Sequence, residues 1–348
     1  MKKRIALIIL AFVLIGLVLS AWKIAGPATA FNKEKYYLFI RTGMNFEELY
    51  VLLKADTVLR SPAVFKWLAA RMDYPANIKA GRYEIRSGES LISIINKLEK
   101  GHQSPVNLII TKLRTKEDLA ALVGRKLECD SAAFFHFLEN DDSLSEYRLD
   151  SNSVMTAIFP NTYNYFWNTG PKRIFSKLFA EYKNFWSPER IKRAEDHGLS
   201  PKTAYIIASI VEEETTKQED KGKMASVYMN RLEKNMKLAA DPTVKFALRN
   251  FELKRIYDKY LQVESPYNTY KYSGLPPGPI CTPTIVTIEA VLSAPKTNYL
   301  YFVAKPDFSG YSNFASDFKQ HMINAKAYQK SLDEQMKIGA EARKAEIK

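Results

Sequence analysis

The residues best suited to chemistry are acidic side chains at the end of an apolar segment. Ser200 and Pro201 are typical of a helix start, and the residues after them are apolar on nearly all sides until Glu212. A helix that is apolar all round is buried in a protein interior. Burial disfavours the charged form of a carboxyl, raises its pKa and prepares it to act as a general acid near neutral pH. We therefore predict that Glu212 is the catalytic residue, with a solvated helix end as the alternative. Glu213 faces another side of the helix and is expected to be exposed.

Two later segments have the side chains of a sugar-binding site. The stretch Asp241-Pro242-Thr243-Val244 is typical of a turn that begins a helix, with Asp241 as its cap. A loop rich in aromatic and amide side chains follows, and it reads Tyr267-Asn268-Thr269-Tyr270 before a stretch rich in Gly and Pro at 274–280. Aromatic rings pack against the C–H faces of sugars, and amide and hydroxyl groups bond their hydroxyl and acetamido groups. Plain turn chemistry is the alternative for both segments.

Other catalytic arrangements are poorly supported by the sequence. It contains no glycine-rich phosphate-binding loop, no Gly-x-Ser-x-Gly nucleophile elbow and no HExxH motif. The four histidines are scattered along the chain, at His102, His136, His197 and His321. We therefore expect no metal site and no cofactor. Two cysteines, Cys129 and Cys281, are too few for a disulfide scaffold, and the sequence leaves open whether they pair.

The N-terminal segment indicates that the rest of the chain is exported. The basic stretch Lys2-Lys3-Arg4 precedes an uncharged, apolar run at 5–22, which as a helix spans about 27 Å, close to the thickness of a membrane core. Basic residues before such a run favour a cytoplasmic N-terminus. A signal peptide cleaved after Ala28-Thr29-Ala30 and a buried core helix are the alternatives. The net charge of +13 favours anionic partners, but an exported protein is not expected to bind nucleic acid.

The elements that must position these residues predict an α+β fold. The chain has 348 residues, enough for two or three domains. Between Tyr36 and Gly101 the patterns predict a strand, two helices, a second strand and a helix, which form a small module. The second half is more helical, with helices expected over 174–186, 188–194, 200–215, 224–232 and 285–292, a strand over 299–303 and a polar helical tail after 332. Residues 264–285 are too rich in Pro and Gly to be regular.

An ordered set of motifs points to a known family. The motifs are Phe159-Pro160-Asn161-Thr162-Tyr163, Ala208-Ser209-Ile210-Val211-Glu212, Ala225-Ser226-Val227-Tyr228-Met229-Asn230-Arg231-Leu232, Asp241-Pro242-Thr243-Val244, Tyr267-Asn268-Thr269-Tyr270, Gly274-Leu275-Pro276-Pro277-Gly278-Pro279-Ile280 and Ala294-Pro295-Lys296-Thr297-Asn298-Tyr299-Leu300-Tyr301-Phe302-Val303. In this order they resemble the MltG-type (YceG-like) endolytic murein transglycosylases of bacteria. The apolar N-terminal run and the small module also fit, so the resemblance covers almost the whole chain.

The resemblance implies an enzyme that cleaves the β-1,4 bond between N-acetylmuramic acid and N-acetylglucosamine without water and leaves 1,6-anhydro ends. The family's catalytic glutamate is the one directly after Ala-Ser-Ile-Val, which is Glu212 here, and it would act as both acid and base. Glu214 matches a second glutamate usually found two residues on. The residues expected to bind the substrate are Glu214, Asn230, Asp241, Thr243, Tyr267, Asn268, Thr269 and Tyr270.

The resemblance also implies the organisation of the chain and its partners. The expected segments are a cytoplasmic stub and transmembrane anchor (1–25), a linker (26–33), a LysM-like peptidoglycan-binding module (34–105), a connecting subdomain (106–155), a catalytic YceG-like domain (156–330) and a polar tail (331–348). The expected partners are peptidoglycan glycan strands, peptidoglycan synthases and the inner membrane, which would hold residues 5–22 and leave the bulk of the chain on the periplasmic or extracytoplasmic side. There the enzyme would terminate glycan strand elongation during cell-wall assembly. Two other functions stay open: a non-catalytic, anchored peptidoglycan-binding scaffold, and a basic protein that binds anionic lipid or polymer.

Overall fold

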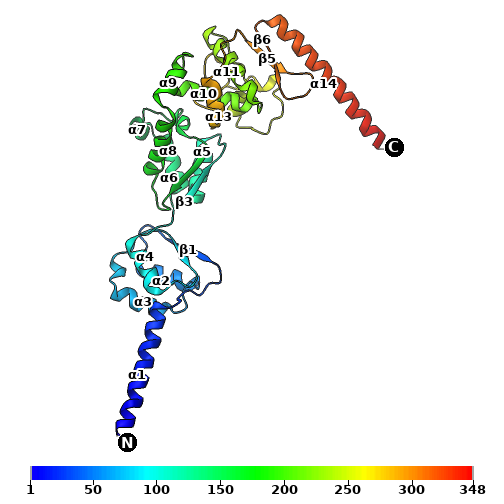
Figure 1. Cartoon of the computed structure of the whole chain (residues 1–348). Coiled ribbons are helices and arrows are strands. Elements are labelled where there is room, and N and C mark those ends of the chain that lie inside the picture. The colour runs from blue at the N-terminus through cyan, green and yellow to red at the C-terminus, as the bar shows by residue number, and fades with distance from the viewer. Residues whose placement is uncertain (1, 347–348) are drawn as a thin grey trace. The chain divides into compact units, whose positions relative to one another are not determined.

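The elements of the chain belong to two units (Figure 1). The structure, a computed structural model, describes residues 2–346. Unit 1 contains the residues up to Leu108 together with Val123–Asp130 and Asn164–Pro171, and unit 2 contains Ile109–Leu122, Ser131–Tyr163 and the residues from Lys172 onward. The described residues form helices and three two-stranded sheets, so the predicted α+β class is confirmed.

The first helix of unit 1, α1 (Lys2–Ala25), is long and apolar enough to cross a membrane. None of its apolar span is buried inside the described part of the protein. The alternative of a buried core helix is therefore wrong. A membrane anchor and a signal sequence both remain consistent with this helix, because both need an apolar segment that does not pack against the protein.

The small module that the sequence predicts makes up most of the remainder of unit 1. Its elements are β1 (Lys35–Ile40), α2 (Phe46–Ala55), α3 (Pro62–Arg71), η1 (Tyr74–Ala76), β2 (Gly81–Arg86) and α4 (Leu91–Lys100). The two strands are antiparallel, with Leu38 opposite Tyr83, and the helices cover their buried face. The order of strands and helices matches the sequence-based prediction. The likeness of this module to LysM stays a prediction.

Local sequence sets the ends of the module's helices. The Asn45 side chain accepts a hydrogen bond from the backbone N–H of Glu48, whose carboxylate accepts one from the backbone N–H of Asn45 in return. This capping box satisfies two N–H groups that an isolated helix end leaves unpaired. The Ser90 side chain caps α4 by accepting from the backbone N–H of Ser93, and Gly101 ends the helix with a φ of 71°, which glycine adopts without steric cost.

The chain passes between the two units in its middle part. The elements there are β3 (Val106–Ile110), α5 (Lys116–Lys126), α6 (Ser131–Glu139), α7 (Asp141–Ser145), η2 (Val154–Ala157), β4 (Asn161–Tyr165), α8 (Pro171–Phe185) and α9 (Pro188–Glu195). β3 pairs with β4. The sequence analysis does not predict β4, because its alternation is short and its pairing partner lies about fifty residues earlier in the chain.

The second half of unit 2 carries the predicted site. Its elements are α10 (Pro201–Glu214), α11 (Gln218–Glu233), α12 (Asp241–Ala247), η3 (Asp258–Tyr260), α13 (Ile285–Leu292), β5 (Tyr301–Ala304), β6 (Ser312–Ala315) and α14 (Phe318–Glu346). Between η3 and α13 the described chain is irregular, as predicted. The expected polar tail is part of α14, and its last two residues, 347 and 348, lie outside the described residues.

Three boundaries in this part differ from the sequence-based prediction. Helix α11 begins at Gln218 rather than 224, because its first turn is polar and adds nothing to the apolar stripe. Asp241 is not the cap of α12: Ala240 occupies the N-cap position and Asp241 is the first helical residue. β6 was not predicted, since it is a short strand that forms by pairing with β5 in an antiparallel hairpin.

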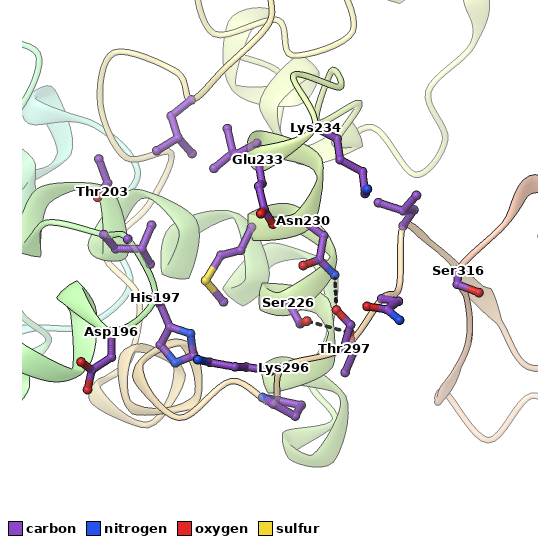
Figure 2. A pocket seen from close by; sticks show the side chains of 18 residues that line it. Asp196, His197, Thr203, Ser226, Asn230, Glu233, Lys234, Lys296, Thr297 and Ser316 are labelled. Carbon is purple, nitrogen blue, oxygen red and sulfur yellow. Dashed lines mark hydrogen bonds between the residues drawn. The ribbon is translucent and has the colours of Figure 1, made fainter.

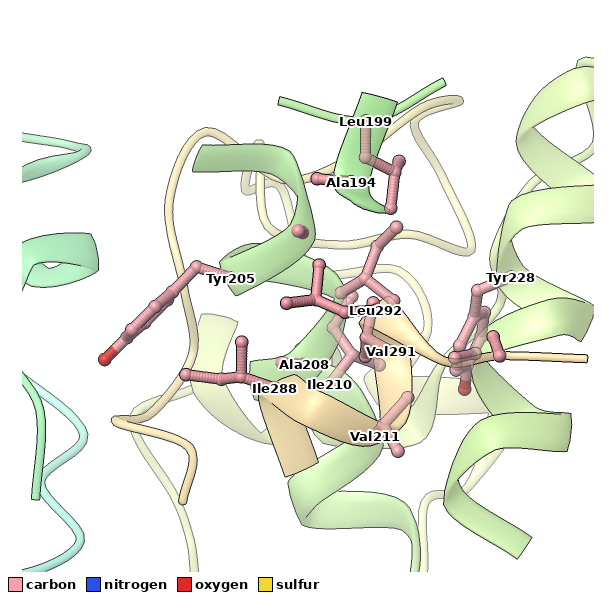
Figure 3. Packing of buried hydrophobic residues seen from close by; sticks show 14 of the residues in the cluster. Ala194, Leu199, Tyr205, Ala208, Ile210, Val211, Tyr228, Ile288, Val291 and Leu292 are labelled. Carbon is pink, nitrogen blue, oxygen red and sulfur yellow. The ribbon is translucent and has the colours of Figure 1, made fainter. Parts of the chain in front are cut away.

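Helix α10 lies at the centre of the core of unit 2, as its apolar sequence predicts. Every residue from Ala204 to Val211 is buried. Figure 3 shows Ile210 and Val211 of α10 packed with Val291 and Leu292 of α13, with Tyr228 of α11 nearby. At its start, Ser200 caps the helix and exchanges hydrogen bonds with Thr203. The core therefore fixes both the position of α10 and the place where its acidic end emerges.

Candidate functional site

Three consecutive glutamates form the C-terminal end of α10, and each has different partners. Residues Glu212, Glu213 and Glu214 are the last three of the helix. Successive side chains on an α-helix point about 100° apart, because the helix has 3.6 residues per turn. The three carboxyls therefore face different parts of unit 2, although they are neighbours in sequence.

Glu212 joins three helices through one oxygen atom. Its Oε2 lies 3.3 Å from Nζ of Lys221 on α11 and accepts hydrogen bonds from the hydroxyls of Thr284, at 3.0 Å, and Thr287. Lys221 also donates to the hydroxyl of Thr287 at 2.5 Å. The side chains of Glu212 and Lys221 are only 10% and 8% exposed. This arrangement suits a carboxylate that acts as a hydrogen-bond acceptor and holds α10, α11 and the start of α13 together.

Glu213 forms a separate ion-pair cluster. Its carboxylate lies 2.9 Å from Nζ of Lys112 and 3.2 Å from Nη2 of Arg114. Burial alone would raise the pKa of Glu213, but the hydrogen bonds and charges of Lys112 and Arg114 lower it below its usual value. The expectation that Glu213 is exposed is wrong, since only 17% of its side chain is accessible once these cations cover it.

Glu214 has the environment of a general acid. The hydroxyl of Tyr228 on α11 donates to its Oε1 at 2.7 Å. Burial raises the pKa of Glu214 to about 7, and the nearby charge of Asp241 acts in the same direction. The hydrogen bond from Tyr228 and the charges of Lys245 and Arg231 oppose this rise. A carboxyl with a pKa near neutrality can both donate and accept a proton at physiological pH.

Asp241 and Tyr270 lie beside Glu214 and bond to each other. The hydroxyl of Tyr270 donates to Oδ1 of Asp241 at 2.6 Å, and burial followed by this bond raises the pKa of Tyr270. Asp241 is exposed, whereas Tyr270 is half-buried. Tyr267 is also half-buried, and its ring packs 4.6 Å from that of Phe246. Asp241, Tyr267 and Tyr270 therefore keep accessible surface, as do the predicted binding residues Glu214 and Asn230, which are half-buried.

Four other predicted binding residues direct their polar groups into the protein. Asn268 is fully buried, and its amide donates to the carbonyls of Leu261 and Val263 at 2.9 Å. The hydroxyls of Thr243 and Thr269 bond to each other at 2.8 Å, and both residues are buried. The amide of Asn230 donates to the carbonyls at 297 and 299. These side chains shape the loops around the site. Their direct contact with substrate stays a prediction, and it is not favoured by their geometry, because their polar groups already bond to the protein.

The sequence analysis did not identify Lys221 and Tyr228 as site residues. They are seven residues apart on α11, so they lie on the same face, and that face packs on α10. The signal in the sequence is a lysine seven residues before a tyrosine of the apolar stripe, because this spacing puts both side chains on the buried face of the helix. Thr284 and Thr287, which cap and begin α13, could not be assigned, because their partner Glu212 lies more than 70 residues earlier.

The sequence profile of the YceG-like family matches residues 38–327, from the first strand of the small module to the first part of α14. This chain belongs to the YceG-like family. The resemblance seen in the motifs is thereby confirmed, and the match includes all three glutamates at the end of α10.

Named relatives of this YceG-like chain are endolytic murein transglycosylases. It is 28% identical over 323 residues to that of Bacillus subtilis (strain 168), a match that covers 88% of this chain and 89% of the relative. It is 27% identical over 313 residues to that of Streptococcus pneumoniae serotype 2 (strain D39 / NCTC 7466), covering 80% of this chain but 56% of the relative. The chain therefore spans little more than half the length of the pneumococcal protein.

A solved structure of the same family has a similar fold. The 2.6 Å crystal structure of a yceG-like protein from Listeria monocytogenes matches with a TM-score of 0.55 and 26% sequence identity. The match covers 83% of this chain and 98% of the Listeria chain. The YceG-like assignment thus rests on both the sequence and the fold.

Proposed function

We propose that this chain is a membrane-anchored endolytic murein transglycosylase that cleaves the β-1,4 bond between N-acetylmuramic acid and N-acetylglucosamine in nascent glycan strands. Membership of the YceG-like family and the names of its relatives support the activity. The observation that carries the proposal is Glu214, whose pKa is raised to about 7 at the end of a buried helix. One such carboxyl is enough if the nucleophile belongs to the substrate itself.

The geometry favours Glu214 over Glu212 as the acid and base. The sequence motif predicts Glu212, and that prediction stays open. However, one oxygen of Glu212 already accepts from an ammonium and two hydroxyls, which leaves it poorly placed to deliver a proton. Glu214 has a single hydrogen-bond donor, Tyr228, and lies beside the accessible residues Asp241 and Tyr270. Glu212 then acts as a positioning residue that fixes the end of α10.

The proposed reaction needs no water. Protonated Glu214 gives its proton to the glycosidic oxygen as the bond from that oxygen to C1 of the muramic acid breaks. The C6 hydroxyl of the same muramic acid attacks C1, and its proton passes to the carboxylate, which restores the acid. The products are a free C4 hydroxyl on the N-acetylglucosamine and a 1,6-anhydro muramic acid end. Ordinary glycosidases use two carboxylates because their nucleophile is water or the enzyme.

The membrane anchor and the role in cell-wall assembly belong to the same proposal. We place α1 in the inner membrane as a single pass, with its N-terminus in the cytoplasm and the bulk of the chain on the other side. An uncleaved anchor is supported by the residues after it, because Ala28 and Thr29 are buried and pair with the module at Glu89 and Leu59. On the outer side of the inner membrane, the enzyme acts on glycan strands as peptidoglycan synthases extend them, and its cleavage terminates strand elongation.

The test is a product analysis with full-length protein in detergent and purified glycan strands. We expect mass spectrometry to find 1,6-anhydro ends with the unchanged protein. Glu214→Gln should lower the turnover rate at least a hundredfold, since a general acid contributes about that factor or more. Glu212→Gln should act through stability and lower the rate less at a temperature where the variant stays folded.

Each other outcome has a distinct meaning. Reducing ends in place of anhydro ends would show hydrolysis and would overturn the proposed reaction. A loss of turnover with folded Glu212→Gln and near-normal turnover with Glu214→Gln would return the acid to Glu212, as the motif predicts. Strand binding without cleavage by any of the three proteins would make the chain a binding scaffold.

A further inference from the structure

A large cavity lies on the flank of α11, away from the three glutamates. Its volume is about 1050 Å³, and it lies between the turn before α10, helix α11 and the irregular segment 294–300. Figure 2 shows labelled side chains from all three, including His197, Asn230 and Lys296. Asn230 lies nine residues after Lys221 on α11, which places the two on faces about 180° apart. The cavity is therefore a feature of unit 2 that the proposed reaction does not use.

The lining of this cavity combines an apolar floor with charges of both signs. Apolar side chains are contributed from four segments, by Leu199, Met229, Leu232, Leu275, Pro295 and Leu300. Two acidic residues, Asp196 and Glu233, and two basic residues, Lys234 and Lys296, also line it. No Phe, Tyr or Trp side chain lines it, and the one ring among its lining residues besides proline is the imidazole of His197. A sugar ring would find none of the large aromatic faces on which sugars usually pack, whereas a ligand with both carboxylate and ammonium groups would find partners for each.

Several polar groups of the cavity have no partner among the described residues. The side chains of Glu233, Lys234, Lys296 and Asn298, all four of them exposed residues, take part in no hydrogen bond or ion pair there. The backbone N–H groups of Lys296 and Asn298 are likewise unpaired within the part of the chain that the structure describes. Free backbone donors beside free side-chain charges are what a peptide ligand requires, because it presents carbonyl groups as well as charged ends.

We propose that this cavity binds the peptide stem that muramic acid carries, an inference that rests on the proposed function. Lys234 and Lys296 pair with the carboxylates of the stem. Glu233 and Asp196 pair with a side-chain amino group of the stem, since its N-terminal amino group is bonded to the muramic acid. The aliphatic side chains of the peptide lie on the apolar floor. Carbonyl groups of the peptide accept from the backbone N–H groups at 296 and 298. A ligand with charges of both signs and small aliphatic side chains satisfies the whole lining, and an uncharged glycan does not.

The position of the cavity on α11 connects this binding to the reaction. Tyr228, which bonds the proposed acid Glu214, and Asn230, which lines the cavity, are two residues apart on that helix. Half the circumference of a helix about 10–12 Å across is about 16–19 Å, and an extended peptide covers about 3.5 Å per residue, so about five peptide residues are needed to pass around α11 from one face to the other. Because the stem and the cleaved bond belong to muramic acid, a bound stem sets which bond reaches Glu214.

The first test measures binding without catalysis. Full-length protein in detergent is titrated calorimetrically with free stem peptide, released from peptidoglycan by an amidase. We expect binding by the unchanged protein and by Glu214→Gln. The double variant Lys234→Ala/Lys296→Ala should bind at least tenfold more weakly, since it loses two charge-assisted contacts. Lys319→Ala, which removes an exposed lysine of α14 outside the cavity, should bind as the unchanged protein does.

The second test compares strands that carry stem peptides with strands stripped of them. We expect the unchanged protein to have a KM at least tenfold lower for the peptide-bearing strands, and the double variant to lose this preference without losing turnover of stripped strands. Equal KM values together with no peptide binding would overturn the cavity proposal while cleavage itself continued. Peptide binding by a protein that cleaves neither kind of strand would instead overturn the proposed reaction and leave the cavity assignment standing.

Discussion

At the scale of single residues, one turn of α10 gives three glutamates three different environments. Glu212 pairs with Lys221, Glu213 with Lys112 and Arg114, and Glu214 with Tyr228. The pKa of Glu213 is lowered and that of Glu214 is raised to about 7, although both are partly buried. The difference comes from the partners, because two cations offset the desolvation of Glu213 and a neutral phenol does not offset that of Glu214.

The pKa of Glu214 predicts how activity depends on pH. If the protonated carboxyl starts the reaction, kcat/KM should fall about tenfold per pH unit as pH rises above about 7. The Tyr228 hydroxyl favours the charged form of Glu214, so Tyr228→Phe should raise the pKa of Glu214 and move the fall in kcat/KM to higher pH. A pH profile of both proteins on peptidoglycan strands measures the shift. A limb that stays in place or moves to lower pH would contradict the role of Tyr228.

The ion pairs of Glu213 predict a dependence of stability on pH. Its folded-state pKa is lowered, so its contribution is present above the unfolded pKa and is lost as pH falls through the folded value. Glu213→Gln should lower the free energy of unfolding at pH 7 by about 1 kcal/mol, a value discounted because Lys112 and Arg114 are partly exposed. Urea denaturation at pH 7 and under acidic conditions tests this, and the two proteins should converge in acid.

An exposed ion pair provides the matched control for Glu213. Glu264 pairs with Lys271 at the surface of the same unit, and its pKa is also lowered. Glu264→Gln should leave the urea midpoint unchanged at pH 7, because water screens a pair at the surface. An equal loss of stability to urea in both variants would show that the partial burial of Glu213 does not strengthen its ion pairs.

At the scale of elements, the site is built where α10, α11 and α13 meet. The apolar faces of these helices form the core, and Glu212 and Lys221 form a buried pair at its edge. The threonines at the start of α13 complete this junction by donating hydroxyl hydrogen bonds to Glu212. Helix α11 has a double role, since one face fixes the glutamates and another lines the cavity proposed to bind peptide.

A double-mutant cycle tests whether Glu212 and Lys221 hold the helices together. Lys221→Met leaves a buried carboxylate without its cation and should lower the free energy of unfolding by about 3 kcal/mol. Glu212→Gln/Lys221→Met should recover most of that loss, because no uncompensated charge remains. Lys192→Met on α9, which removes an exposed pair with Asp196, should change little. Urea denaturation of the unchanged protein, Glu212→Gln, Lys221→Met and the double variant gives the coupling, and additive losses would contradict a positioning role for Glu212.

At the scale of the whole molecule, an apolar helix, a small module and a helical unit follow one another along the chain. Cys129 and Cys281 are both buried, free thiols, which answers the question that the sequence left open. The stability of each unit therefore comes from its own core, without a covalent link between distant segments. Helix α1 adds nothing to either core, and its apolar surface is explained only by an environment outside the protein.

The exposed apolar surface of α1 predicts firm membrane attachment. The full chain should stay with membranes through an alkaline carbonate wash, and deletion of residues 2–25 should release it into the soluble fraction. N-terminal sequencing of the membrane-bound protein should find the start of α1. A mature protein that begins after Ala30 would instead identify a cleaved signal peptide. Protease added to spheroplasts should digest the bulk of the chain if it lies outside the cytoplasm.

Local sequence determined much of this protein. The capping box at Asn45 and Glu48, the apolar run of α1 and the apolar surface of α10 each depend on residues only a few positions apart. Such patterns fix where a helix begins and which side of it is buried, and they predicted the order of elements in the small module. The motifs also determined the family, since their order along the chain is itself a property of the sequence.

Only the tertiary structure decided how the environments of Glu212 and Glu214 differ. Glu212 directly follows the apolar segment and Glu214 lies two residues further on, and sequence alone favoured the first. The partners that distinguish them come from elsewhere: Thr284 and Thr287 lie more than 70 residues away from Glu212, and Tyr228 lies on the next helix from Glu214. A carboxyl's protonation depends on the charges and donors within a few ångströms, and packing rather than chain order brings those groups together.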